Sequence, residues 1–311
     1  MTEGISTAHM SREEWLKLRK TGIGGSDAGA ICGLNPYSSP MSVYQDKISE
    51  CLESEVADNE SMRQGRDLEE YVAQRFMEAT GLKARRSNRM YRSRQQPFMI
   101  ADVDRLIIGE DAGLECKTAS AYSADKWKDG EVPSHYLIQC YHYMAVTGKG
   151  AWYIAVVILG KGFQYTKVSW DDDMIRNLIS IESDFWNNHV IPKNMPEPDG
   201  SKACDEVLEQ YFHTARKESS IPLVGFDEKL KRREEIIQLV KKLEQEQKQI
   251  EQEVKLYMKD CEMAVSSRYQ VIWSNLESVR LDTKRIKMER PEIYKDFLNV
   301  TASRRFTVKA A

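Results

Sequence analysis

Long apolar runs are missing from this chain of 311 residues. No stretch approaches the roughly 20 apolar residues that a membrane-spanning helix needs. The first residues, Met-Thr-Glu-Gly-Ile-Ser, also lack the basic start and the apolar stretch of a secretory signal peptide. We therefore expect a cytoplasmic protein that has no membrane partner.

Cysteine motifs are missing as well. The six cysteines are scattered, with no C-x-x-C pair and no histidines at a matching spacing. This excludes the usual patterns of a zinc site or a disulfide framework, and we expect most of the cysteines to be buried free thiols. They are Cys32, Cys51, Cys116, Cys140, Cys204 and Cys261.

An overall basic excess is the third absence, because the formal net charge is −3. Residues 1–200 carry 23 basic and 29 acidic residues, whereas residues 201–311 carry 22 and 19. Residues 264–311 alone carry ten basic and five acidic residues. Global charge thus gives no support for nucleic-acid binding, so any contact with DNA must rest on local patches. A metal site would explain the acidic first part.

The most informative stretch is a predicted β-hairpin at residues 101–117, in which two apolar runs flank an acidic turn with glycines. Asp104 falls on its first strand, while Glu115 and Lys117 share one face of the second. Two carboxylates this close repel each other unless a divalent cation lies between them, and the lysine then supplies a donor to a phosphate oxygen or to water. This favours nuclease chemistry, although a surface hairpin with ordinary exposed charges fits the pattern equally well.

A glycine-rich turn at residues 21–27 follows a short helix that opens with the capping box Ser11–Glu14. We expect Ser26 or Asp27 to be the N-cap of the next helix, through Ile31. The turn then exposes backbone N–H groups that suit a phosphate. A plain tight turn between helices is the simpler interpretation.

The remaining pattern up to residue 200 predicts an α/β (α+β) sandwich with a mixed central sheet flanked by helices. A stretch rich in proline and glycine at residues 191–200 closes this domain. We expect helices over residues 40–48, 61–80, 134–147 and 171–185, antiparallel strands over 83–92 and 98–108, strands over 152–159 and 163–170, and a surface loop over 52–60.

The C-terminal part, residues 227–311, follows a linker over residues 201–226. A long charged helix there carries a seam at alternating spacings of four and three, the pattern of a coiled coil or helical hairpin. Beyond it lies a small basic α+β tail with a strand over residues 269–273 and a short helix after Pro291; its interleaved aromatics suit a nucleic-acid surface and equally a solvated face. The seam comprises Ile236, Val240, Leu243, Gln247, Ile250, Val254, Tyr257 and Cys261.

Seven short motifs between residues 10 and 190 are weak alone but specific in this order. They are Trp15–Arg19, Gly22–Asp27, Asn35–Tyr37, Gly65–Glu69, Asp102–Asp104, Glu115–Lys117 and Tyr136–Gln139. In these motifs the chain resembles the YqaJ-type viral recombinases, which look like the lambda-exonuclease branch of the PD-(D/E)XK nucleases. The resemblance implies a restriction-endonuclease-like core over residues 1–200.

The same resemblance implies a metal site. Asp104 and Glu115 would bind Mg²⁺, for which Mn²⁺ is a possible substitute, and the backbone carbonyl of Cys116 would be a further ligand. Lys117 would position or activate the attacking water, and Glu69 would reach a second metal or its waters. Superfamily members with an iron–sulfur cluster need four spaced cysteines near the core, so we exclude a cluster here.

Around the metal site, the resemblance places Gln139 near the lysine and assigns Arg19 and Ser26 to the terminal 5′-phosphate. A dianion held by Arg19 would set the register of the scissile bond, so that one nucleotide is cut at a time. The chain departs from some relatives at Asp102, where they have a small residue. We expect Asp102 to share a strand face with Asp104 and to be a possible extra ligand.

The resemblance implies a Mg²⁺-dependent 5′→3′ exonuclease on double-stranded DNA that leaves a 3′ single strand for a single-strand annealing protein in phage-type recombination. Relatives work as toroidal trimers, so we expect a homo-oligomer that encloses DNA, in the host cytoplasm if the chain is phage-encoded. Two alternatives stay open. One is a structure- or sequence-dependent DNA endonuclease, and the other is a non-catalytic DNA-binding scaffold that recruits the annealing protein.

Overall fold

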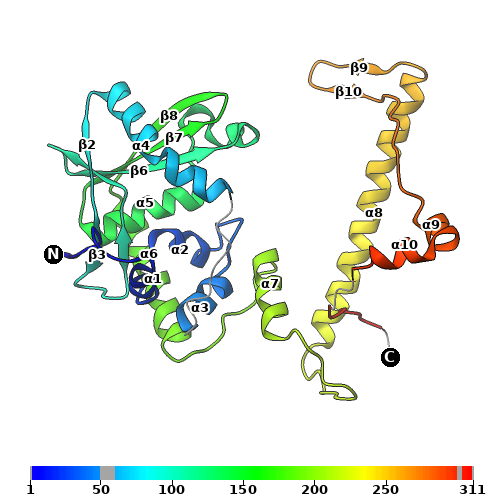
Figure 1. The fold of residues 1–311 in the computed structure, drawn as a ribbon, viewed down its shortest axis with the longest axis horizontal. Coiled ribbons are helices and arrows are strands. Elements are labelled where there is room, and N and C mark those ends of the chain that lie inside the picture. The colour runs from blue at the N-terminus through cyan, green and yellow to red at the C-terminus, as the bar shows by residue number, and fades with distance from the viewer. Residues whose placement is uncertain (1, 50–59, 300–302, 310–311) are drawn as a thin grey trace. The chain divides into compact units, whose positions relative to one another are not determined.

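The computed structural model describes residues 2–49, 60–299 and 303–309, and the chain forms two compact units (Figure 1). The first unit spans Met1–His213 and the second Thr214–Ala311. The predicted surface loop at residues 52–60 lies outside the described residues except for Glu60, which begins a helix. No helix in the described part of the chain is long and apolar enough to cross a membrane.

The helices of the first unit mostly begin where the sequence predicts. The capping box at Ser11 and Glu14 is present, and Gly148 ends its helix in the left-handed conformation. The predicted helix over residues 134–147 has these same bounds, and Pro133 is its N-cap. The helices are α1 (Arg12–Lys20), α2 (Gly25–Ile31), α3 (Pro40–Ile48), α4 (Glu60–Thr80), α5 (Ser134–Thr147), α6 (Asp172–Phe185) and α7 (Lys202–Tyr211), with a 3₁₀ segment at Ala121–Gly130 and a π-helical turn at Trp186–Val190.

The strands form one sheet of five, in the order β2-β5-β6-β7-β8, and one of three, in the order β1-β3-β4. In the larger sheet β6 and β7 pair in parallel, while the other neighbours are antiparallel, so the predicted mixed sheet is confirmed. The strands are β1 (Thr2–Ser6), β2 (Lys83–Arg86), β3 (Arg89–Ser93), β4 (Ile100–Asp102), β5 (Arg105–Ile108), β6 (Ala112–Ala119), β7 (Ala151–Ile158) and β8 (Gly162–Ser169).

Each of the two predicted long strands, at residues 83–92 and 98–108, divides into two short strands that belong to different sheets. The first breaks at Asn88, which has a φ of 48°, and the second at Asp104. The N–H of Ser87 donates to the carbonyl of Asp104 across 3.2 Å, so the two breaks face each other. Asp104 therefore lies in a bend and not on a hairpin strand. Alternation of apolar residues continues on both sides of such a bend, so the pattern does not show it.

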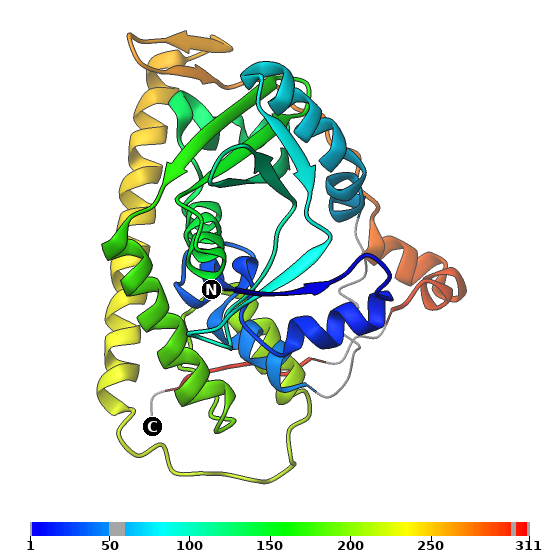
Figure 2. The same cartoon turned by 90° about the vertical axis from the view of Figure 1, so that its left-hand side faces the viewer.

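The core packs against both faces of the larger sheet (Figure 1, Figure 2). Residues of α5 and α6 pack with β7 on one face, and α4 packs on the other with Phe76 against Tyr153. β7 is buried at every position, as expected for its nearly continuous apolar run. Gly113 of β6 is required here, because a Cβ would lie 2.3 Å from the ring of Trp152.

Helix α7 extends the first unit beyond the predicted boundary at residue 200. Cys204 and Val207 are buried with Met41 of α3. Because α7 covers apolar surface on α3, part of the predicted linker at 201–226 is a packed helix.

The second unit contains the predicted long helix and small α+β tail. The helix α8 ends before Cys261, and the strand and helix of the tail lie where the sequence places them. Five residues of the predicted seam, Ile236, Val240, Leu243, Ile250 and Tyr257, are exposed. The elements are α8 (Asp227–Met258), β9 (Met263–Val265), β10 (Gln270–Ile272), α9 (Thr283–Glu289) and α10 (Pro291–Asp296).

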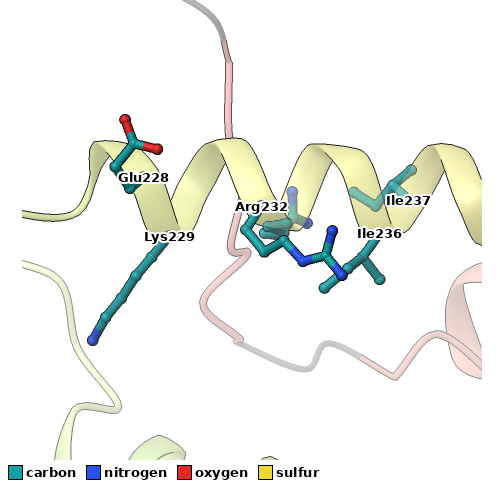
Figure 3. A pocket seen from close by; sticks show the side chains of 6 residues that line it. Glu228, Lys229, Arg232, Ile236 and Ile237 are labelled. Carbon is teal, nitrogen blue, oxygen red and sulfur yellow. The ribbon is translucent and has the colours of Figure 1, made fainter.

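A hollow at the start of α8 is lined by residues of this one helix: Glu228, Lys229, Arg232, Arg233, Ile236 and Ile237 (Figure 3). Among the described residues, its lining contains a single carboxylate, that of Glu228, and comes from α8 alone. The hollow therefore lacks the converging groups of a catalytic site, which lie in the first unit.

Candidate active site

Asp104, Glu115 and Lys117 form a cluster, here called the carboxylate cluster after its two acids. It lies where the chain passes from the smaller sheet to the larger one. Glu115 and Lys117 are on β6, and Asp104 is in the bend that precedes its partner strand β5. The N–H of Cys116 donates to Oδ2 of Asp104 at 2.8 Å, and Nζ of Lys117 lies 2.5 Å from Oε1 of Glu115. The structure thus brings the three predicted residues together.

The charges in this cluster perturb one another. Burial, and after it the charge of Glu115, raises the pKa of Asp104 well above its ordinary value. Burial alone lowers the pKa of Lys117, but the carboxylates of Glu115 and Asp104 outweigh it and raise that pKa. The ammonium also lies 4.7 Å from the centre of the Tyr136 ring. Lys117 is therefore a cation at neutral pH.

Gln139 of α5 links the cluster to the helix behind the sheet. Its Nε2 donates to Oε1 of Glu115 at 2.7 Å and to the hydroxyl of Tyr143 at 2.7 Å. Oε1 of Glu115 thus accepts from both Gln139 and Lys117. This fixes the orientation of a carboxylate that is only 4% exposed.

The other carboxylate oxygen of Glu115, Oε2, is buried and has no hydrogen-bond partner among the residues that the structure describes. Leaving such an acceptor unpaired costs about 1–3 kcal/mol, and more for a charged group. A divalent cation takes carboxylate oxygens as ligands, and its charge would relieve the repulsion between Glu115 and Asp104. The residues present therefore fit a metal ion.

Glu69 of α4 is held by arginines rather than by the cluster. Its Oε1 accepts from Arg86 at 3.2 Å and from Arg105 at 3.3 Å, and Arg105 also binds Glu70 at 2.9 Å. Across the residues that the structure describes, no three His, Cys, Asp or Glu side chains lie close enough to share a metal. Sequence reasoning overlooked Arg105, although a charged residue opening the apolar run Arg105–Ile108 was visible.

A cavity of about 180 Å³, here called the end cavity, opens beside the cluster. Within it Nη2 of Arg19 donates to Oγ of Ser26 at 2.6 Å. The structure thus brings together the two residues that the resemblance assigned to a phosphate, and Gln139 belongs to both sites. The lining residues are Trp15, Arg19, Gly24, Gly25, Ser26, Met90, Ile100, Asp102, Gln139 and Tyr143.

Asp27 is paired with Arg19, a residue that lines the end cavity. It occupies the third position of α2 and accepts the N–H of Gly24 at 2.9 Å, so the prediction of Ser26 or Asp27 as N-cap is wrong and Gly24 is the cap. Its carboxylate lies 2.7 Å from Nζ of Lys47 and 3.5 Å from Nη2 of Arg19. Burial alone raises the pKa of Asp27, but these two cations lower it to about 2.

Asp102 faces the end cavity. Its Oδ2 accepts from the indole N–H of Trp15 at 2.7 Å. Burial raises the pKa of Asp102, and the hydrogen bond from Trp15 opposes that rise. β4 ends at Asp102 and the chain then bends, so the prediction that Asp102 and Asp104 share a strand face is wrong.

Comparison with known proteins identifies the family. A family model described as the YqaJ-like viral recombinase domain matches residues 14–150. The uncharacterised protein YqaJ of Bacillus subtilis (strain 168) is 36% identical over 305 residues, which cover 97% of this chain and 95% of that protein. The chain belongs to the YqaJ-like viral recombinase family.

Solved structures share the fold of this YqaJ-like protein. An alkaline exonuclease, LHK-Exo from Laribacter hongkongensis, superposes with a TM-score of 0.51 at 17% identity, covering 65% of this chain and all of that one (100%). The same enzyme in complex with dAMP gives a TM-score of 0.50 at 18% identity, with coverages of 65% and 98%. The likeness confirms the predicted fold class.

The match to the YqaJ-like domain spans both the carboxylate cluster and the end cavity, from Trp15 to Tyr143.

The sequence did not indicate a buried pair behind these sites. It consists of His142 of α5 and Glu182 of α6, both fully buried. Nδ1 of His142 lies 2.8 Å from Glu182, and Nε2 lies 2.8 Å from the carbonyl of Ile100. Through these two contacts His142 links α5 and α6 to β4. Burial alone lowers the pKa of His142, but Glu182 more than offsets that effect and the pKa is raised.

Proposed function

We propose that this YqaJ-like protein is a metal-dependent deoxyribonuclease that degrades double-stranded DNA from its 5′ ends and leaves a 3′ single strand. The observation that carries the proposal is the buried, unpartnered Oε2 of Glu115 in a cluster with Asp104 and Lys117. The family and the fold shared with an alkaline exonuclease support it.

The proposed metal ligands are the carboxylates of Asp104 and Glu115 and the backbone carbonyl of Cys116. A bound Mg²⁺ would supply Lewis-acid activation of the phosphodiester and of water, and Mn²⁺ would substitute for it. Glu69 is proposed as a ligand of a second metal or of its waters. To bind them, its carboxylate must leave the ion pairs with Arg86 and Arg105.

Two side chains around the metal ligands, Lys117 and Gln139, donate hydrogen bonds and orient the Glu115 carboxylate. Lys117, whose Nζ lies 2.5 Å from Oε1 of Glu115, would donate to a phosphate oxygen or position or activate the attacking water. Gln139 holds Oε1 of Glu115 and so leaves Oε2 free to bind.

The end cavity is the proposed seat of the 5′-terminal nucleotide. Arg19 and Ser26 would bind its phosphate, because a guanidinium and a hydroxyl are donors that suit a phosphate oxygen. Gln139 belongs to the end cavity and to the cluster, so a bound 5′ end lies at a fixed distance from the scissile bond. This arrangement supports cleavage one nucleotide at a time.

We extend the proposal to the assembly and its partner. A ring-shaped homotrimer around DNA would give processivity without a basic exterior, which suits a net charge of −3. A single-strand annealing protein would receive the 3′ strand. Light scattering of the full chain tests the first point, and a pull-down with the purified annealing protein tests the second.

Digestion of linear and covalently closed duplex DNA tests the proposed activity. With Mg²⁺ we expect linear DNA to be degraded and closed circles to stay intact, and EDTA to stop the reaction. Cutting of closed circles would favour the endonuclease instead. DNA binding with no hydrolysis under any divalent metal would favour the scaffold.

A further inference from the structure

Glu69 lies between two arginines, one buried and one half-exposed. Its Oε1 accepts from Arg86 at 3.2 Å and from Arg105 at 3.3 Å. The two arginines are direct partners across β2 and β5, a position in which like charges repel each other. Glu69 therefore neutralises two cations that the register of the sheet places opposite each other.

The two arginines differ in what they can reach. The side chain of Arg105 is 5% exposed and has a second acceptor in Glu70 at 2.9 Å, so it stays neutralised when Glu69 turns away. The side chain of Arg86 is 53% exposed. An ion pair with so exposed a partner contributes little to stability, so another anion at the surface can replace it. Arg86 is thus the exchangeable partner of Glu69.

The segment that carries Arg86 suits a DNA backbone. Residues 83–94 contain six basic residues and no acidic one, although the whole chain has a net charge of −3. Such a chain must contact DNA through local basic stretches, because phosphate contacts supply most of the non-specific affinity. Ser87 follows Arg86 directly, and its N–H donates to the carbonyl of Asp104 at 3.2 Å. A phosphate on Arg86 would therefore lie near the bend that carries a proposed metal ligand.

The charge of Glu69 acts on the carboxylate cluster. Burial and then the charge of Glu115 raise the pKa of Asp104, and Glu69 adds to that rise. Glu69 also adds to the rise in the pKa of the Cys116 thiol, of which burial is the main cause. Because interactions between charges weaken with distance, Glu69 is a near neighbour of the cluster even while the arginines hold its Oε1.

We propose that Arg86 couples DNA binding to the second metal site: a backbone phosphate takes the guanidinium of Arg86 from Glu69, and the carboxylate of Glu69 then turns to the carboxylate cluster. Arg105 stays paired with Glu70. The proposal rests on the proposed function, in which Glu69 serves a second metal or its waters. Without DNA the arginines hold Glu69 back, so the metal pocket is completed only when a substrate is in place.

The neighbouring residue Arg85 provides a matched control. It is also exposed on β2, but strand side chains alternate, so it lies on the opposite face from Arg86. Arg85→Gln therefore removes the same charge from the same strand and leaves the ion pair of Glu69 intact. Arg86→Gln removes that ion pair from one side. Glu69→Gln removes it from the other side and leaves Arg86 free for a phosphate.

The first measurement is the Kd of the full chain for a duplex, by fluorescence anisotropy in EDTA, so that neither metal binding nor hydrolysis contributes. Glu69→Gln should bind the duplex about fivefold tighter than the wild type, because it frees Arg86. Combined with Arg86→Gln, the same change should alter Kd by less than about twofold. Combined with Arg85→Gln, it should keep the gain of about fivefold.

The second measurement titrates the chain with Mn²⁺ in the absence of DNA and follows the bound ions by electron paramagnetic resonance. We expect the wild type to bind a second Mn²⁺ only weakly and Arg86→Gln to bind it about fivefold tighter, because Glu69 has lost one of its cations. Arg85→Gln should match the wild type. Arg86→Ala provides a second neutral variant if Arg86→Gln does not fold.

An equal gain from Glu69→Gln with and without Arg86 would overturn the coupling. So would a second Mn²⁺ site that is unchanged in Arg86→Gln, and a loss of thermal stability without either effect would leave Arg86 a structural role alone. If the wild type binds no Mn²⁺ at all, or no duplex, the proposed function fails and the coupling with it.

Discussion

Gln139 donates a hydrogen bond from Nε2 to Oε1 of Glu115 over 2.7 Å, and the same side chain lines the end cavity. One residue therefore touches both the proposed metal ligand and the proposed seat of the 5′ end. The two sites meet at α5, whose residues Cys140 and Tyr143 are buried in one core with β7, so the fold holds the two sites next to each other.

Replacing Gln139 by leucine should lower activity by about 10–100-fold, because partners that orient a metal ligand have effects of this size. The fold should survive, since leucine is close to glutamine in volume. The measurement is the initial rate of nucleotide release from linear duplex at several Mg²⁺ concentrations. Gln164→Leu on the exposed face of β8 is the matched control and should behave as wild type. Equal rates in the two variants would contradict the orienting role.

Glu115→Gln should abolish the binding of a divalent cation, because it removes the charge and leaves a buried amide at the position of Oε2. We expect the wild type to bind Mn²⁺ in calorimetry and this variant to show no heat at the same concentration. Lys117→Ala should keep Mn²⁺ binding and lose activity by on the order of 100-fold or more, since it removes a donor to the phosphate or to water. Normal Mn²⁺ binding by Glu115→Gln would refute this assignment of the ligand.

Asp27 should make stability depend on pH in the acid range. Its pKa is lowered from 3.8 to about 2 by Lys47 and Arg19 against the effect of burial. The carboxylate therefore contributes about 2 kcal/mol above pH 4, and this contribution is lost as the pH falls from about 4 to about 2. Urea unfolding of Asp27→Asn should show a lower midpoint at pH 7 and a gap to wild type that narrows toward pH 2.5.

The control for that measurement is Asp173→Asn, because Asp173 is 82% exposed at the start of α6. Its unfolding midpoint should follow the wild type at every pH. A gap for Asp27→Asn that stays constant down to pH 2.5 would show that the depressed pKa is not its cause.

Gly25 should not tolerate alanine. A Cβ there would lie 2.6 Å from Cε1 of Tyr143 and 2.9 Å from Cγ of Gln139, so α2 would have to move away from α5. We expect a loss of about 1–3 kcal/mol in the free energy of unfolding. We also expect a lower affinity for DNA ends, because Gly25 lines the end cavity. Gly162→Ala is the control, because a Cβ there would meet no atom of the described residues within 4 Å, apart from its own chain neighbours. Equal thermal stabilities of the two variants would disprove the close packing.

Most of the fold follows from local patterns in the sequence. The capping box at Ser11, the glycine that ends α5 at Gly148 and the apolar run of β7 each reflect chemistry within a few neighbouring residues. The division of each of the two predicted long strands into two short ones did not follow from local patterns. It depends on the facing bends at Ser87 and Asp104, which lie 17 positions apart in the chain.

The candidate site was predictable to a similar degree. Charged residues inside apolar runs indicated Glu115 and Lys117, and the resemblance supplied Arg19, Ser26 and Gln139. The environment of Asp102 was not predictable, because its partner Trp15 comes from α1 and is brought to it by the packing of that helix. Arg86, which holds Glu69 from β2, was missed for the same reason.

The proposed activity depends on a divalent metal that Asp104 and Glu115 hold for hydrolysis from a DNA 5′ end. The most direct measurement is digestion of one linear duplex labelled at either the 5′ or the 3′ end, with Mg²⁺, by the wild type and by Glu115→Gln. We expect immediate release of mononucleotide from the 5′ label, retention of the 3′ label in long single strands, and no release by the variant. Release from the 3′ label first, or equal activity of Glu115→Gln, would contradict it.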